Sequence, residues 1–130
     1  MVAVDTNVLV RLLTADDAAQ HRVALKLFSS TEIYIPDSVV LETEWVLRAA
    51  YRLSSIEICD TFKTVFGLEN VTLSNGQLVA QAVAWHEAGL DFADAFHLAQ
   101  SQDCESLKTF DSDFIKRARN LSHCAVEKPA

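Results

Sequence analysis

VAVDTNVLVRLL, residues 2–13, decides the fold class, because it joins a strand signal directly to a helix signal. Residues 2–4 form a short apolar run that ends at Asp5. Thr6 and Asn7 can then cap a helix whose apolar residues recur at helical spacing, namely Val8, Leu9, Leu12 and Leu13. The stretch therefore predicts a strand and then a helix, with an acid where the strand ends.

The same alternation continues along the chain. Short β-branched or aromatic runs predict strands at 33–35, 71–73, 106–110 and 124–126. Apolar residues at helical spacing predict helices at 18–29, 36–51, 54–67, 76–88 and 113–119, with another that opens at Asp91. Strands that alternate with helices predict an α/β fold with a mainly parallel sheet and helices on both faces.

Local signals mark several helix ends. Ser54 and Glu57 have the spacing of a capping box, which starts the helix over 54–67. We expect Gly67 to end that helix in the left-handed conformation, and Gly89 to end the helix over 76–88.

Composition indicates one globular domain, residues 1–130, because 130 residues with 50% hydrophobic content leave no room for two cores. No apolar stretch approaches the roughly 20 residues of a membrane span, so no membrane partner is expected. An acid near the start and three separated cysteines, Cys59, Cys104 and Cys124, favour a cytoplasmic protein without a disulfide framework.

The net charge of −7 argues at first against a nucleic-acid partner. Carboxylates that face bound cations would account for part of this excess. A basic group, Lys116, Arg117 and Arg119, can hold RNA phosphates, or it is the solvated cationic end of a helix; the two readings weigh about equally.

Three acids stand where predicted helices begin. Asp5 and Asp111 each follow a strand, at the edge of a parallel sheet where ligands bind. Asp94 follows Asp91 by three residues, which places it in the first turn of its helix if Asp91 is the cap. Taken singly, such acids are explained by helix capping, which is worth about 1 kcal/mol.

Glu42 is harder to explain by capping, because it lies in the middle of a predicted helix. A helical projection places it on an apolar face, with Val39, Thr43, Val46 and Ala50. A carboxylate there must extend to solvent, find a cation or be protonated, and the other acids nearby favour a metal ion. Glu44 projects to the opposite side, where we expect a solvated pair with Arg48.

Four segments in this order resemble the PIN-domain ribonucleases, and the likeness extends from about residue 2 to residue 126. They are residues 2–13, IPDSVVLETEWVLRAAY (35–51), GLDFADAFHLA (89–99) and LKTFDSDF (107–114). Within that group the chain looks most like the VapC toxins of bacterial toxin–antitoxin pairs.

The resemblance implies a three-layer α/β/α sandwich with an acidic pocket that binds Mg²⁺ or Mn²⁺ and cleaves RNA with metal-activated water. By position, it implies catalytic and metal-binding roles for Asp5, Glu42, Asp94 and Asp111, with Thr6 and Asn7 in support. Asp91 and Asp113 are flanking acids whose roles vary among members. Oxygen ligands alone also suit magnesium or manganese better than zinc or copper.

The same likeness implies a protein antitoxin that blocks the pocket, a homodimer, and operator DNA that is bound only through the antitoxin complex. The residues around Trp45 and Trp85 can belong to an interface or to the core, and we expect the core.

Two other functions compete with metal-dependent RNA cleavage. A phosphatase with an aspartyl intermediate also uses an acid after the first strand, but such enzymes carry a DxDx motif and position 7 is Asn7. A non-catalytic module that binds RNA or a protein partner would show no turnover. Metal-dependent cleavage of a panel of RNAs separates the three.

Overall fold

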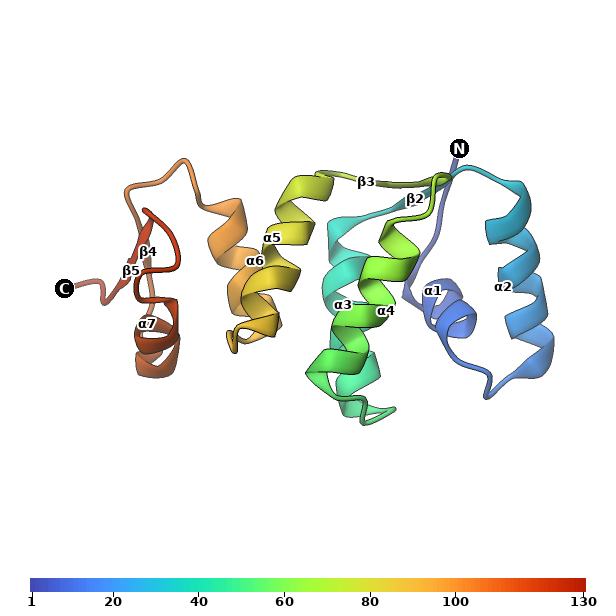
Figure 1. The fold of residues 1–130 in the computed structure, drawn as a ribbon, viewed down its shortest axis with the longest axis horizontal. Helices are drawn as coiled ribbons and strands as arrows, with labels where there is room; N and C mark the ends of the chain where they lie inside the picture. Colours follow the sequence, from blue (N-terminus) through green and yellow to red (C-terminus); the bar gives the residue numbers. More distant parts are fainter. The chain divides into compact units, whose positions relative to one another are not determined.

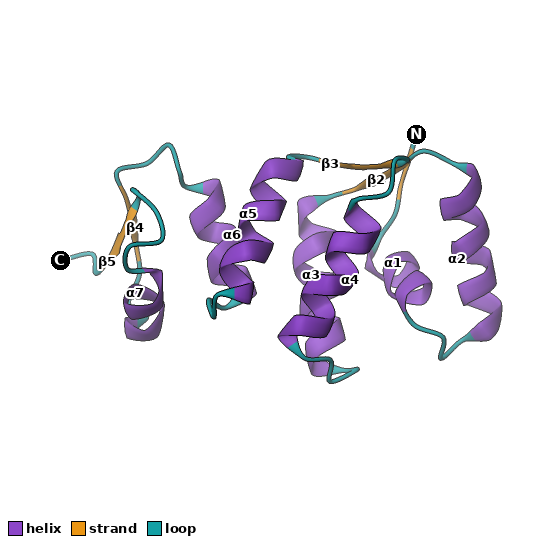
Figure 2. Cartoon of the chain, viewed as in Figure 1, coloured by secondary structure: helices purple, strands orange, loops and turns teal.

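The computed structural model describes residues 1–130 and contains seven helices and five short strands (Figures 1 and 2). The chain divides into two compact units, Met1–Gly76 and Gln77–Ala130. All strand pairs are parallel, and helices separate successive strands within the first unit. The predicted α/β class with short parallel sheets is therefore confirmed.

The sheet of the first unit has three strands in the order β1-β2-β3, drawn in orange in Figure 2. They are β1 (Val2–Ala3), β2 (Ile33–Ile35) and β3 (Val71–Leu73). Ile33 is paired with Val2 on one side and with Val71 on the other. β2 is thus central, and its Ile33 and Ile35 side chains are fully buried.

Four helices belong to the first unit: α1 (Thr6–Leu13), α2 (Ala18–Ser30), α3 (Asp37–Ala49) and α4 (Ser55–Phe66). Helix α1 packs against both α2 and α3, and α3 also packs against α4 (Figure 1). Fully buried side chains hold these elements together, and they include Leu9, Val40, Leu47, Ile58 and Phe62. Each such side chain contributes about 1.5–3 kcal/mol through burial.

The second unit contains α5 (Gly76–Glu87), α6 (Phe92–Gln100), β4 (Ser106–Lys108), α7 (Ser112–Ala118) and β5 (Ala125–Glu127). Strands β4 and β5 are parallel, and α7 packs against β5. The ring of His86 at the end of α5 meets Phe92 at the start of α6 edge-on, with centroids 5.5 Å apart. Its Nδ1 lies 2.7 Å from the carbonyl oxygen of Leu90, so the same histidine also fixes the α5–α6 turn.

Helix ends follow the predicted signals with two exceptions. The N-cap of α1 is Asp5, so the prediction that Thr6 and Asn7 cap this helix is wrong; both lie inside it. Both bonds of the Ser54–Glu57 capping box are present, and Gly89 has a left-handed φ of 112°. Gly67, however, has φ −85°, so the prediction of a left-handed end there is wrong. A side chain is excluded at Gly67 for a different reason: its Cβ would lie 2.9 Å from the carbonyl oxygen of Lys63.

Two other predictions need correction. The fourth strand was expected to reach Phe110, but β4 ends at Lys108, because the backbone then turns toward α7. Trp85 is buried as expected, whereas Trp45 is 57% exposed. Trp45 follows the buried pair Thr43 and Glu44 and lies on the outer side of α3.

No helix in the structure combines the length and the apolar character that crossing a membrane requires.

Candidate acidic site

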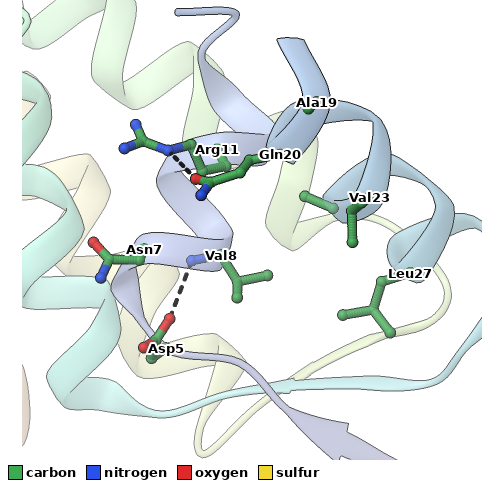
Figure 3. Close-up of a pocket in the computed structure, with 9 residues that line it drawn as sticks. Asp5, Asn7, Val8, Arg11, Ala19, Gln20, Val23 and Leu27 are labelled. Carbon is green, nitrogen blue, oxygen red and sulfur yellow. Dashed lines mark hydrogen bonds between the residues drawn. The ribbon is translucent and has the colours of Figure 1, made fainter. Parts of the chain in front are cut away.

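Asp5 lies between β1 and α1 and is the N-cap of that helix. Its backbone is extended, with φ −92° and ψ 180°, and its Oδ1 accepts a hydrogen bond from the Val8 N–H at 3.1 Å (Figure 3). The side chain is exposed. The strand and the cap together therefore present one carboxylate oxygen to solvent at the carboxyl end of β1.

Glu42 is connected to this position through Thr6. The Thr6 hydroxyl, which is buried, donates a hydrogen bond to Oε1 of Glu42 across from α1 to α3. Since Thr6 directly follows Asp5, the structure brings two of the four predicted acids to the same part of the first unit. Asn7, the other supporting residue, is exposed on α1.

The predicted faces of α3 are wrong for both glutamates. Glu42 is exposed, whereas Glu44 is only 3% exposed. The buried stripe consists of Val39, Val40, Thr43, Glu44 and Leu47. Helix α3 packs against both α1 and α4, so the buried arc is wider and rotated relative to the face that apolar residues alone predict.

The pairing of Glu44 with Arg48 is confirmed, although its solvent exposure is not. Arg48 Nε donates to Glu44 Oε2 at 2.9 Å, and Nη2 approaches Oε1 at 3.5 Å. This ion pair compensates the buried charge of Glu44. Glu42 has no such cation and accepts the neutral Thr6 hydroxyl instead.

A second group of acids lies within the second unit, around Asp94. Asp91 is the N-cap of α6, and its Oδ1 accepts the Asp94 N–H at 3.1 Å. Asp94 itself is half-buried in the first turn. Burial raises the pKa of its carboxyl group, the negative charges of Asp91 and Asp111 raise that pKa further, and His97 lowers it.

Asp111 is the N-cap of α7, as predicted. Its Oδ1 accepts the N–H groups of Asp113 at 2.9 Å and Phe114 at 3.2 Å, and its own N–H donates to the Thr109 hydroxyl at 3.0 Å. Asp111 and Asp113 are both exposed. Within the second unit, Asp91 and Asp111 thus lie close enough to Asp94 for their negative charges to raise its pKa.

Capping and ligand binding are compatible at Asp5, Asp91 and Asp111. In each case the cap hydrogen bonds engage Oδ1. Each carboxylate keeps a second oxygen that the cap does not use. Capping fixes the side chain and leaves that oxygen for a cation, so the two roles do not exclude each other.

The donor set fits a hard divalent cation. The four predicted acids supply oxygen only, as Mg²⁺ and Mn²⁺ prefer. Asp16, Glu44 and Glu127, which are not among the four, form ion pairs with basic side chains. Within neither unit alone do three or more His, Cys, Asp or Glu side chains form a group that could hold a metal ion.

The basic residues predicted to bind substrate lie on or next to α7. Lys116 and Arg119 are exposed. Arg117 is exposed as well, but its Nη1 donates to the carbonyl oxygen of Gly89 at 3.3 Å. Arg117 therefore has a structural contact, while Lys116 and Arg119 present their charges to solvent.

A hollow of about 380 Å³ opens beside Asp5, between α1 and α2 (Figure 3). Its wall is mainly apolar, with Val8 on α1 facing Val23 and Leu27 on α2. Arg11 lies one turn beyond Asn7, where its Nε donates to Gln20 at 2.7 Å. The hollow thus extends from the candidate acid along an apolar surface.

One exposed side chain next to these acids was not anticipated. Phe110 had been assigned to a strand, where alternate residues turn inward. It instead lies after the end of β4, directly before Asp111, and is exposed. The signal in the sequence was the Thr109–Asp111 pair, whose hydroxyl and acid form a local turn around Phe110.

No curated protein matches the chain significantly. The family comparison, in contrast, covers most of the sequence: the PIN domain matches residues 2–120. That range includes all four predicted acids and every element from β1 to α7. The chain therefore belongs to the PIN domain family and has its nuclease-type α/β/α fold.

Proposed function

We propose that this chain is a Mg²⁺- or Mn²⁺-dependent endoribonuclease, and that it acts in the cytoplasm as the VapC-type toxin of a type II toxin–antitoxin pair. Its metal-binding acids are Asp5, Glu42, Asp94 and Asp111. The observation that carries the proposal is the PIN domain match over residues 2–120, supported by the half-buried Asp94, which lies close enough to Asp91 and Asp111 to feel their negative charges. A divalent cation would offset that crowding of negative charge.

The chain's own residues hold the acids in place. Backbone N–H groups orient Asp5 and Asp111, and the Thr6 hydroxyl orients Glu42. Asp5, Glu42, Asp94 and Asp111 would hold the divalent ion, which when bound would offset charge on the scissile phosphate and lower the pKa of a bound water. The acids position that ion and are not themselves nucleophiles.

RNA binding is supported by the exposed cations beside the second group of acids. Lys116 and Arg119 lie on the segment that follows Asp111, so they can meet phosphates near the cleaved bond. Asp91 adds negative charge beside Asp94, which favours cation binding, and Asp113 lies next to the site through its N–H, which donates to Asp111.

The proposed partners are a cognate antitoxin and a second copy of the chain, with operator DNA bound through the antitoxin complex. The apolar hollow beside Asp5 supports the antitoxin proposal, because a segment lying there would cover that acid. The exposed Trp45 supports an interface on α3.

Cleavage of a panel of single-stranded and structured RNAs tests the activity. We expect cleavage by the purified chain with Mn²⁺ or Mg²⁺ and none after chelation. Asp5→Asn should lower the rate by roughly 100-fold or more, because it removes a metal-binding charge. The cap of α1 survives, since Asn also caps helices well.

Asp17→Asn is the matched control. Asp17 caps α2 by accepting the Gln20 N–H at 3.0 Å, in the way that Asp5 caps α1, but it is not one of the proposed ligands. Its variant should keep wild-type activity. Equal activity of the Asp5→Asn and wild-type proteins in an assay free of contaminating nuclease would refute the proposed site.

A further inference from the structure

Phe110 is the most exposed aromatic side chain in the protein, with 80% of its surface accessible. Other phenylalanines, such as Phe62, Phe92 and Phe96, are completely buried. An exposed phenyl ring does not contribute to the core, and this one lies directly before Asp111, where its face is free to contact a ligand of that site.

Hydrogen bonds fix the backbone on both sides of this ring. The Thr109 N–H donates to the carbonyl oxygen of Glu127 on β5 at 3.0 Å, and the Asp111 N–H donates to the Thr109 hydroxyl at 3.0 Å. Asp111 is in turn bonded to the first turn of α7. The ring therefore projects from an ordered backbone, which lowers the entropy cost of binding against it.

The side chain of Lys128 reaches the backbone of Phe110. Lys128 Nζ donates to the carbonyl oxygen of Phe110 at 3.4 Å, and no acid is paired with it. The neighbouring Lys108 differs, since Glu127 neutralises it at 2.5 Å. The turn from Thr109 to Asp111 thus carries a flat apolar surface and an acid, and Lys128 brings a positive charge to its backbone.

We propose that Phe110 stacks on an unpaired base of the RNA, in the nucleotide next to the bond that is cut, while Lys128 meets a phosphate of the same strand. The inference rests on the proposed nuclease function and adds two substrate-contacting residues to it, Phe110 and Lys128. Phe110 directly precedes Asp111, so the ring lies next to an acid to which the proposed function assigns metal binding.

A base is the occupant that these features favour, because each nucleotide offers both a flat π surface and a negative charge. Aromatic side chains that stack on unpaired bases are a general means of binding single strands. Bases inside a duplex are already stacked on each other and are not accessible to the ring. Phe110 therefore selects single-stranded over double-stranded substrate.

Steady-state cleavage by the full chain tests this inference, with one oligoribonucleotide presented single-stranded or annealed to its complement. For the single strand, we expect Phe110→Ala to raise KM by about 5- to 100-fold with little change in kcat. Phe110→Leu should behave like Phe110→Ala, because it keeps an apolar side chain without a ring. Phe110→Tyr and Phe110→Trp should retain wild-type KM.

Ile56→Ala is the matched control, because Ile56 is 72% exposed on α4 and adjoins none of the proposed acids. Its KM should equal that of the wild type. An unchanged KM in Phe110→Ala, or a full recovery by leucine, would overturn the stacking role. A change of oligomeric state in Phe110→Ala at unchanged KM would assign the ring to a protein contact instead and would also overturn it.

Binding without turnover separates this inference from the proposed function. Single-stranded RNA carrying 2-aminopurine loses fluorescence when the base stacks on an aromatic ring. In the Asp5→Asn background we expect quenching that disappears in Asp5→Asn/Phe110→Ala. Quenching without any cleavage by the wild type would refute the nuclease proposal and retain the ring as a base-binding residue. Cleavage without ring-dependent quenching would retain the nuclease proposal and refute the stacking role of Phe110.

Discussion

Thr6 joins two helices through a single hydroxyl group, which it donates to Glu42. Thr6→Val keeps the shape and burial of the side chain but removes that hydrogen bond. If the hydroxyl orients a metal ligand, RNA cleavage should fall by roughly 10- to 100-fold while the folded structure persists. Cleavage rates, with circular dichroism as the check on folding, measure this.

Thr61→Val serves as the control for loss of a threonine hydroxyl. Thr61 donates to the carbonyl oxygen of Glu57 at 2.7 Å, within one helix and apart from the acids. Its substitution should leave cleavage unchanged. Equal rates for Thr6→Val and Thr61→Val would show that the Thr6 hydroxyl has no part in positioning Glu42.

Glu44 is a buried acid whose charge is compensated by Arg48. Arg48→Met keeps much of the aliphatic stem but leaves the carboxylate without its cation. We expect the free energy of unfolding to fall by about 1–3 kcal/mol, measured by urea denaturation at neutral pH. Arg22→Met, at an exposed position on α2, should change it by less than about 0.5 kcal/mol, and similar losses for both variants would contradict the buried role.

The sequence predicted the partner of Glu44 but not its burial, and the reason is physical. An i,i+4 spacing fixes which side chains meet on a helix, whatever surrounds that helix. Which side is buried depends on the neighbours, and α3 has two of them, α1 and α4. Glu42, selected for its apparent burial, is exposed; it remains a candidate through family likeness and through its bond to Thr6.

At the scale of elements, the α1–α2 connection is tied to the end of α3 by Asp16. The Tyr51 hydroxyl donates to Asp16 Oδ2 at 2.7 Å and the Thr14 hydroxyl to Oδ1 at 3.0 Å. Mainly through these two hydrogen bonds, the pKa of Asp16 is lowered from its ordinary 3.8; Arg11 contributes less. The folded state therefore favours the ionised carboxylate.

This shift predicts an acid-sensitive contact. Because the folded pKa lies below the unfolded value, the stabilisation is complete above about pH 4 and is lost as pH falls through the folded pKa. The difference in unfolding free energy between the wild type and Tyr51→Phe should be constant from pH 5 to pH 8 and should shrink below about pH 4. Urea denaturation across this range measures it.

Tyr34→Phe supplies the control, since the half-buried Tyr34 on β2 has no such contact with Asp16. Its difference from the wild type should not vary with pH. A Tyr51→Phe difference that stays constant down to pH 2.5 would contradict the role of this hydrogen bond.

Helix boundaries were predicted best where a side chain caps the end of the helix through a hydrogen bond to its backbone. The Ser54–Glu57 box and the caps Asp5, Asp91 and Asp111 all lie where the sequence indicated. The end of β4 was misplaced by two residues, because Thr109 and Phe110 have strand-like side chains but lie in the turn that Asp111 stabilises. Strand propensities of single residues do not predict the hydrogen bond from the Asp111 N–H to the Thr109 hydroxyl, which ends the strand.

At the scale of the whole molecule, metal binding should stabilise the folded chain. Any ligand that binds only the folded state adds about 2.7 kcal/mol at 100 times its Kd. We expect Mn²⁺ to raise the melting temperature of the wild type, and the rise should be abolished or strongly reduced in Asp94→Asn. Differential scanning fluorimetry with and without a chelator measures both.

Asp103→Asn removes the same charge from an exposed position of the second unit and should keep the full rise. An equal rise in Asp94→Asn and Asp103→Asn would mean that Mn²⁺ acts through general charge screening. It would then count against Asp94 as a ligand.

Fold class was the property that the sequence predicted best, because local residue patterns show where strands and helices alternate. The family match over residues 2–120 agrees with it. The candidate site was accessible only in part. Asp5 and Asp111 could be located from the strand–acid–helix pattern, whereas the Thr6–Glu42 bond joins residues 36 positions apart and depends on helix packing. The exposure of Phe110 was not predicted, because its side chain is typical of a strand and only the turn between Thr109 and Asp111 exposes it.

The use of Oδ1 for capping has a genetic consequence. One G-to-A transition converts an aspartate codon into an asparagine codon, and the new side chain offers the same Oδ1 to the backbone N–H groups of α1 or α7. Cells selected for loss of this activity should therefore yield full-length, folded chains altered at Asp5 or Asp111. Such chains would keep their folded surfaces, so they would still compete with intact copies for binding partners.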